Sequence, residues 1–378
     1  LGLDPLPSAP GSPEHEYLVQ SFMDLRRPVP HTTDVLCVLE PNTTPQTTYV
    51  LNRGNPHAPG DMVHPAFPTM LGGGSPEIVV PAHGESSGRR LALARWITDP
   101  DNLRTARVMV NRIWQYHFGE GLVPTPNDFG HLGLPPSHPE LLDWLALEFI
   151  ERGWSIKAMH RLIMQSEAYR RSGRSPDTAR RVDPMNRGLT WFPMRRLEAE
   201  ELRDSILQVN GTLNLQLGGP SIYPPMPEEV LATSSRPDAA WSSSPPDQAA
   251  RRSLYIHVKR SLLHPMLTVF DLADTDSTCP VRFSTLQPTQ ALTMLNSDFI
   301  NEQADLLAIR LEHDAGDRDE DRLRQGYQFV LQRAPDSQEL ASGLELLRTL
   351  EEQGMDRHDA LKYHCLVLLN LNEFIFID

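Results

Sequence analysis

The chain has 378 residues, and its 35 Lys and Arg residues against 49 Asp and Glu residues give a formal net charge of −14. This length is typical of two domains, or of one large domain with insertions. The acidic balance, without a basic block in the sequence, argues against non-specific nucleic-acid binding, which requires neutralisation of phosphates. No stretch approaches about 18 consecutive apolar residues, so the sequence predicts no transmembrane segment.

Proline is frequent, at 34 of 378 residues, and it is unevenly placed. Fourteen prolines lie in residues 1–85 and seven more lie in residues 220–246. Because proline lacks a backbone N–H and disfavours helix at the preceding residue, both segments are predicted to be irregular or extended.

Residues 1–85 are expected to form a Pro-rich segment, irregular or β, that wraps a larger core. Two short runs in it, Asp34–Glu40 and Thr47–Leu51, are rich in Val, Leu, Thr and Tyr, which favours strands. Residues 51–68 are dense in turn-forming residues and are expected to be a loop. We therefore expect a small β-hairpin packed on something larger.

Residues 86–217 are predicted to be a first helical block, because apolar residues recur there at three- and four-residue steps. Ser137 and Glu140 match a capping box, and Ser155 is expected to cap the next helix. The expected helices cover residues 91–97, 102–118, 137–153, 155–163 and Arg195–Val209. They are expected to pack around four tryptophans, Trp96, Trp114, Trp144 and Trp154.

Residues 218–253 are rich in Pro and Ser and are predicted to be a long surface loop. Residues 254–378 are predicted to hold a strand, Ser253–Val258, and a C-terminal helical block that forms one domain with the first block. The expected helices of this block are Gln290–Leu311, Asp321–Gln332, Asp336–Glu351 and Arg357–Leu369. The predicted fold class is mainly α: a multi-helix globular domain with a small β-hairpin near the N-terminus and long Pro-rich loops.

The densest polar cluster of the sequence runs from residue 107 to residue 138 and supplies a candidate polar site. Its members are Arg112, His117, Asn127, Asp128 and His138. The structural alternative is that His117 bonds the helix end, Asp128 and Asn127 form an Asx turn, and Arg112 pairs with Asp128.

A metal site is a further alternative within this cluster. Zinc and iron accept the nitrogen and oxygen donors that are present here. The spacing of these donors fits no compact ligand motif, so no metal is predicted and the set is kept as an alternative. Its members are His117, Asp128, His131 and His138.

Four arginines are candidate anion-binding residues, because a guanidinium fork suits a carboxylate, sulfate or phosphate. They are Arg195 and Arg196 at the expected start of a helix, Arg260 after the expected strand, and Arg282 in a loop. Internal salt bridges are the alternative, since acidic residues are abundant. Paired carboxylates of the kind that glycosidases use also occur, but they are more often solvated or arginine-bound. These carboxylates are Glu198 and Glu201, and Asp271, Asp274 and Asp276 near Arg282.

Several motifs of catalysis and cofactor binding are missing from the sequence. There is no G-x-S-x-G nucleophile elbow, no G-x-G-x-x-G and no P-loop. Cys37, Cys279 and Cys365 are widely spaced, and they form neither a disulfide framework nor a C-x-x-C site.

Long motifs of this chain resemble a domain of unknown function common in planctomycetes and related bacteria. It is the C-terminal domain of their cytochrome c-associated exported multidomain proteins. The resemblance spans about residues 34–378 and rests on residues 105–170, DPMNR at 183–187, RRLEAEELRDSIL at 195–207, GGP at 218–220, VKR at 258–260, RFSTLQPTQALTMLNSDFI at 282–300, RGNP…PG at 53–60 and NEFIFID at 372–378.

The resemblance implies a periplasmic, extracellular or cell-surface protein, and a haem-attaching C-x-x-C-H domain usually precedes this region. No C-x-x-C-H occurs in this chain, so no cofactor is expected in it; haem c would lie on an absent upstream domain or on a partner, a c-type cytochrome domain or protein. The chain begins without a signal peptide and without Met, so we expect a processed or truncated piece.

No catalytic residues transfer from the resemblance. The first functional hypothesis is an accessory or docking module of an extracytoplasmic cytochrome c-linked redox assembly. The alternatives are an enzyme, hydrolase or redox, acting on polysaccharide or a related polymer, and a cell-surface structural or interaction protein. For the enzyme, the site is expected between the 112–138 region and the 218–250 loop.

Overall fold

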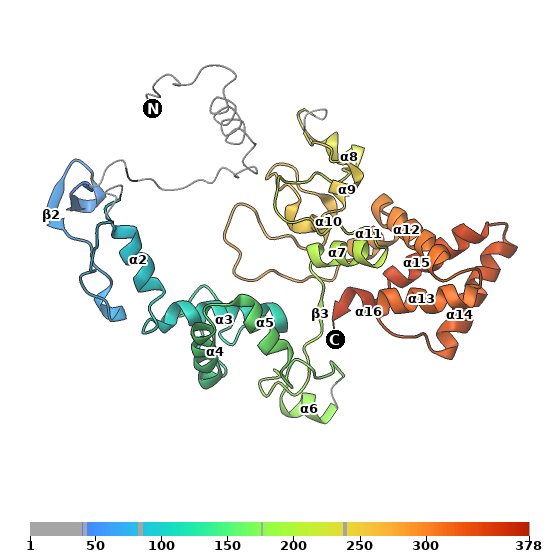
Figure 1. Ribbon diagram of the computed structural model, residues 1–378, viewed down its shortest axis with the longest axis horizontal. Coiled ribbons are helices and arrows are strands. Elements are labelled where there is room, and N and C mark those ends of the chain that lie inside the picture. Colours follow the sequence, from blue (N-terminus) through green and yellow to red (C-terminus); the bar gives the residue numbers. More distant parts are fainter. Residues whose placement is uncertain (1–39, 41–43, 82–85, 175–176, 237–239, 378) are drawn as a thin grey trace, which may run out of the picture. The chain divides into compact units, whose positions relative to one another are not determined.

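The computed structural model describes residues 40, 44–81, 86–174, 177–236 and 240–377 (Figure 1). Residues 40–215 and 222–378 group into one compact unit, and the following concerns that unit. Helices dominate it, as predicted, and the described strands form two small two-stranded sheets. Among the described residues, no helix combines the length and the apolarity that a membrane crossing requires.

The predicted hairpin near the N-terminus is present. Strand β1 (Thr48–Leu51) pairs antiparallel with β2 (Pro59–Val63), with Thr48 opposite Val63. The turn-rich segment was therefore wrongly expected to be only a loop: its Pro and Gly obscure a strand that β1 stabilises by pairing. Every residue of both strands is exposed, so the hairpin is not packed on a core. The other expected strand, Asp34–Glu40, lies outside the described residues except for Glu40.

The first helical block contains α2 to α6. Their bounds are α2 (Arg89–Ile97), α3 (Leu103–Phe118), α4 (Pro139–Glu151), α5 (Ile156–Met164) and α6 (Asp177–Val182). Helix α3 packs along α4, and their apolar faces enclose Val110, Leu145 and Phe149 with Met159 of α5. These residues are buried because they recur at helical spacing on the faces that meet.

The predicted tryptophan core is only partly correct. Trp114 is buried and stacks on Phe118, with ring centroids 4.2 Å apart. Trp154 packs against Phe149, but Trp144 is 48% exposed on the outer face of α4. Trp96 stacks on Phe67 outside this cluster.

The predicted capping box at Ser137 is wrong, and the cap at Ser155 is confirmed. Helix α4 starts at Pro139 with His138 as its N-cap, because proline is pre-organised for the first helical position and needs no N–H partner there. The Ser137 hydroxyl instead donates to the Leu122 carbonyl. The Ser155 side chain accepts from the Ala158 N–H at 3.3 Å.

The rest of the unit holds β3, β4 and the helices from α7 to α16. Their bounds are β3 (Arg195–Arg196), α7 (Ala199–Val209), α8 (Glu228–Leu231), α9 (Pro246–Ala249), the 3-10 turn η4 (Ser253–Tyr255), α10 (Pro265–Val269), α11 (Pro288–Asn296), α12 (Asp298–Asp314), α13 (Asp319–Leu331), α14 (Ser337–Glu352), α15 (Arg357–Leu369), α16 (Asn372–Ile375) and β4 (Phe376–Ile377). Helix α12 packs along α15, and α14 also contacts α15 (Figure 1). A second apolar cluster includes Leu307 and Leu311 of α12, Leu323 of α13 and Leu369 of α15.

The predicted helix bounds in this region are confirmed where a capping residue and the apolar periodicity indicate the same start. Helix α15 has the predicted bounds, and α14 begins at the predicted Asp336 capping box. The predicted helix Gln290–Leu311 is two helices, because Ser297 is extended and caps α12 through the Ile300 N–H. The predicted strand Ser253–Val258 is wrong: η4 and a single β-bridge, from Ile222 to Ile256, take its place.

The prediction that Arg195 and Arg196 open a helix is wrong. They form β3, opposite Ile377 and Phe376 of β4, so a pairing with a distant segment overrides the local preference. Helix α7 begins at Ala199 and is capped by a box of Glu198 and Glu201.

A histidine joins α15 to α12 through two carboxylates. The ring nitrogens of His358 lie 3.1 Å from Asp305 and 3.1 Å from Glu312, and Lys362 lies 4.0 Å from Asp305. Burial alone would lower the pKa of His358, but the hydrogen bonds and negative charges of Asp305 and Glu312 outweigh it and raise that pKa.

We expect His358→Gln to destabilise the fold at low pH more than at high pH. A histidine whose pKa is raised by folding stabilises fully below its unfolded pKa of about 6.5, and this contribution is lost as the pH rises through the folded pKa. His358 and its two carboxylate partners are partly exposed, so the substitution should lower the free energy of unfolding by less than about 1 kcal/mol at pH 5.5. Urea unfolding at pH 5.5 and pH 8.5 measures it, with the exposed His131→Gln as control. Equal losses at both pH values would contradict the prediction.

Candidate functional site

The five candidate polar residues are placed in three separate locations. Arg112 donates to the Asn127 side-chain oxygen at 2.6 Å, so it pairs with Asn127 rather than with Asp128. Asp128 accepts from the Gly130 N–H at 2.8 Å, which is the turn interaction expected as the structural alternative. His138 lies at the N-cap of α4, 3.0 Å from the Ser137 hydroxyl.

The loop that carries Asn127 and Asp128 is fixed to α3 by a buried amide. Asn111 donates to the Val123 carbonyl at 3.0 Å and accepts from the Val123 N–H at 2.7 Å. Gly121 is required beside it, because a Cβ there would lie 2.6 Å from the Asn111 amide nitrogen. The loop therefore leaves α3 along a defined path.

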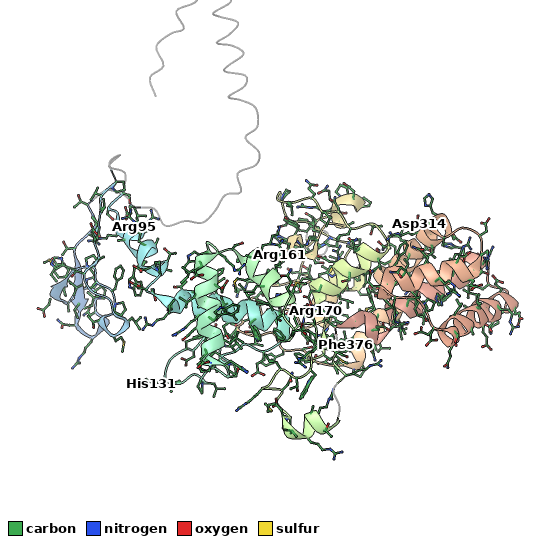
Figure 2. The ribbon with its side chains drawn as sticks, turned by 60° about the horizontal axis from the view of Figure 1, so that its bottom comes forward. Arg95, His131, Arg161, Arg170, Asp314 and Phe376 are labelled. Atoms are coloured by element: carbon green, nitrogen blue, oxygen red, sulfur yellow. The ribbon has the colours of Figure 1, made fainter. Side chains whose placement is uncertain are left out.

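The alternative metal set does not assemble. His131 is exposed (labelled in Figure 2), and Asp128 is engaged by its own turn. In the described part of the chain, no group of three or more His, Cys, Asp or Glu side chains is placed to hold a metal ion.

His117 instead pairs with a histidine that the sequence did not single out. Its Nε2 lies 2.8 Å from Nδ1 of His160 on α5, and the Tyr169 ring packs edge-on against it with centroids 5.3 Å apart. Burial, followed by the positive charges of His160 and Arg195, lowers the pKa of His117 to about 4. At neutral pH its ring is therefore uncharged.

We expect His117 to titrate near pH 4 in the folded protein. Its folded pKa lies below the unfolded value of about 6.5, so the free energy of unfolding should fall as the pH drops from about 6.5 towards 4. Histidine ring NMR signals followed from pH 8 to 4, assigned by comparison with His117→Gln, measure the titration. A midpoint near 6.5 for His117 would show that the ring is not buried as described.

Three of the four candidate anion-binding arginines gather at one cavity of about 550 Å³. Arg195 and Arg196 reach it from β3, and Arg282 reaches it from the segment that precedes α11. The end of α3 and β4 complete it, with Phe376 of β4 labelled in Figure 2. We call this cavity the Arg282 pocket. Its other lining residues include Gln115, Tyr116, Met194, Glu198, Glu201, Asp271, Cys279, Phe283 and Leu286.

Carboxylates of the chain itself meet each arginine of the pocket. The Arg195 fork donates to Glu201 at 3.0 and 3.2 Å. The Arg282 fork donates to Glu200 at 2.6 and 2.9 Å, and Arg282 also lies 3.1 Å from Glu198. These are the two-pronged contacts that guanidinium groups favour.

Arg196 is the most buried of the three, with its side chain 4% exposed. Its guanidinium lies 2.5 Å from Asp271 and 5.1 Å from the centre of the Phe270 ring. Asp271 also accepts from the Thr285 N–H at 2.9 Å and from the Thr285 hydroxyl at 2.8 Å. One carboxylate therefore anchors both β3 and the segment that carries Arg282.

Arg260, the fourth candidate, does not reach the pocket. Its side chain is 72% exposed and pairs with Asp276. All four arginines thus have an internal carboxylate partner, and an external anion would have to displace it.

Neighbouring carboxylates in the pocket have pKa values shifted in opposite directions. Burial raises the pKa of Glu198 in spite of the nearby Arg282. Burial also acts on Glu201, but the Arg195 hydrogen bonds and the Glu198 N–H outweigh it and lower the Glu201 pKa. Separated pKa values suit acid–base chemistry, but both groups are also held by the capping box and by arginines.

The rim of the Arg282 pocket is apolar and exposed. Tyr116 is 63% exposed, Phe283 84% and Leu286 75%, and Met194 is 60% exposed beside them. Exposed apolar residues scattered singly are ordinary, whereas a group of them around one cavity is a candidate interaction surface. The sequence gives little indication of this rim, apart from the position of Tyr116 off the apolar stripe of α3.

We expect Asp271→Asn to lower the free energy of unfolding by about 3 kcal/mol, because it removes the carboxylate that is hydrogen-bonded to the buried guanidinium of Arg196. Asp276→Asn is the matched control, since its partner Arg260 is exposed, and should cost less than about 1 kcal/mol. Urea unfolding at pH 7 measures both. A loss below about 1 kcal/mol for Asp271→Asn would show that Arg196 does not depend on it.

The chain matches a known family model. The model of a family described as PSD1, a protein of unknown function (DUF1553), matches residues 89–347. The match covers more than half of the chain, so the chain belongs to this family, and the resemblance read from its motifs is confirmed. The matched span includes the three arginines of the Arg282 pocket. Comparison with curated proteins found no match, and comparison with solved structures found none either.

Proposed function

We propose that this member of the PSD1 family is an accessory module that docks a c-type cytochrome domain in an extracytoplasmic redox assembly. The observation that carries the proposal is the exposed apolar rim of the Arg282 pocket. The partner would have an apolar haem edge surrounded by basic side chains. It would also carry the haem, since this chain has no C-x-x-C-H.

The charge around the rim supports this choice of partner. Glu120 follows the pocket-lining Gly119, Asp274 follows the pocket-lining Ala273, and both side chains are exposed. The whole chain carries a formal charge of −14. Opposite charges around an apolar contact speed association and orient the partner, without requiring tight binding.

The size of the rim suits a transient contact. Four exposed side chains form a small patch, and weak redox encounters bury less than about 1,200 Å² in total. A docking site for electron transfer needs fast release, so a small patch with complementary charge is a reasonable design.

A polymer-degrading enzyme is less well supported. That hypothesis requires Asp128, His117 and an arginine to converge in an open cleft, but Asp128 closes its own turn and His117 pairs with His160. The carboxylates of the Arg282 pocket are occupied by arginines. The opposite pKa shifts of Glu198 and Glu201 are the one observation in its favour.

Binding to a basic c-type cytochrome tests the proposal. We expect saturable binding by calorimetry at about 10 mM ionic strength, weakened at least about tenfold at 200 mM because charge attraction is screened. Tyr116→Ser and Phe283→Ser should each weaken binding at least about fivefold, since they shrink the apolar contact. Glu120→Lys should also weaken it at low salt.

The control variant is Tyr363→Ser, which removes an aromatic side chain that is 44% exposed on α15. It should leave the affinity unchanged. Absence of binding at low ionic strength would overturn the proposal, and so would equal losses in the rim variants and in the control.

A further inference from the structure

We propose that a second cavity, formed by one face of α3 and the loop after it, binds an organic polyanion that carries carboxylate, sulfate or phosphate groups. The cavity has a volume of about 630 Å³. We call it the α3 arginine pocket. Its lining residues are Arg104, Arg107, Val108, Arg112, Pro126, Asn127 and Phe129.

The three arginines share a face because of their spacing. At about 100° per residue, positions 104, 107 and 112 fall within an arc of about 140° and along about 12 Å of helix. The loop held by Asn111 brings Pro126 and Phe129 over this face. The helix spacing and the fixed loop thus place the three arginines in the wall of one cavity.

Negative charge is scarce among the described residues around these arginines. Arg104 donates to the Leu71 carbonyl at 3.3 Å and Arg112 donates to Asn127 at 2.6 Å, so both contact neutral oxygens. Arg107 pairs with the carboxylate of Asp143 at 2.6 Å. Among the described residues that line the cavity there is no acidic residue.

The Arg282 pocket provides an internal comparison. It also gathers three guanidinium groups, and the chain supplies four carboxylates to them: Glu198, Glu200, Glu201 and Asp271. Among the described residues, by contrast, the three arginines that line the α3 arginine pocket have Asp143 as their carboxylate partner, through Arg107. Like charges held together repel one another, and a bound anion relieves that repulsion.

The remaining walls indicate what else the ligand carries. Phe129 is 40% exposed and, with Pro126 and Val108, offers an apolar surface beside the guanidinium groups. Planar guanidinium forks bind carboxylate, sulfate and phosphate oxygens in pairs. The volume is in the range that accommodates small organic ligands. A ligand with two or more anionic groups on a carbon skeleton fits both kinds of wall.

This site is separate from the proposed docking rim. None of its lining residues lines the Arg282 pocket, so each can be tested without altering the other. Failure of cytochrome binding would not contradict the anion site, and failure of citrate binding would not contradict the docking proposal.

Calorimetric titration with citrate, inorganic sulfate and inorganic phosphate tests the proposal at low ionic strength. We expect saturable 1:1 binding of citrate, with at least about tenfold weaker binding of the inorganic anions, which cannot contact the apolar wall. Arg104→Gln with Arg112→Gln should weaken citrate binding at least about tenfold. Arg112→Lys keeps the charge but loses the fork, so its affinity should lie between those of the wild type and the double variant.

The control is Arg161→Gln, which removes an exposed arginine on α5 (labelled in Figure 2) and should not change citrate binding. Backbone NMR shifts of the wild-type protein on citrate addition should be confined to α3 and residues 126–129. This second measurement tests the proposal even if the double variant does not fold. The proposal would be overturned if Arg161→Gln weakened citrate binding as much as the double variant does. It would also be overturned by NMR shifts outside α3 and residues 126–129, or by binding of all three anions that depends on ionic strength alone.

Discussion

The buried ion pair between Arg196 and Asp271 is the contact on which the candidate site depends. The charge of a guanidinium that is almost fully removed from water must be compensated by a nearby carboxylate. Asp271 does this while also fixing Thr285, so the segment that carries Arg282 is positioned by the same carboxylate that holds β3. The pairing of β3 with β4 then adds Phe376 to the wall of the pocket.

Charge is distributed very differently at the two arginine clusters. At the Arg282 pocket the chain neutralises its own guanidinium groups, and what remains available to a partner is the apolar rim. At the α3 arginine pocket Arg104 and Arg112 contact neutral oxygens and Arg107 pairs with Asp143, so positive charge remains available. One helix, α3, thus contributes to an apolar contact surface near its C-terminus and to a cationic cavity nearer its N-terminus.

The parts of the fold that could be predicted are those encoded locally. Helix α15 and the capped start of α14 follow from helical periodicity and from side chains that satisfy the first N–H groups. The strand β3 could not be predicted, because two residues carry no periodic signal and their partners lie far along the chain. Ser297 divides α11 from α12 by adopting an extended conformation within a continuous apolar pattern.

In the candidate site too, the sequence indicates some residues, but their partners are set by the tertiary structure. Arg195, Arg196 and Arg282 could be singled out from the sequence because arginines suit anions, but their partners are set by tertiary structure. The sequence predicts that Glu198 and Glu201 are solvated or arginine-bound, and the geometry supports the second interpretation. His160 gave no signal at all, since nothing local indicates that α5 will place it against His117.

The pair of His117 and His160 has a consequence for proton position. Their contact joins Nε2 of one ring to Nδ1 of the other, at 2.8 Å. When both rings are neutral, exactly one of these two nitrogens carries the shared hydrogen, so either both rings are Nε2–H tautomers or both are Nδ1–H tautomers. A group that contacts the outer nitrogen of one ring and selects its tautomer therefore also selects the tautomer of the other. The two helices α3 and α5 are thus linked through a hydrogen that has two alternative positions.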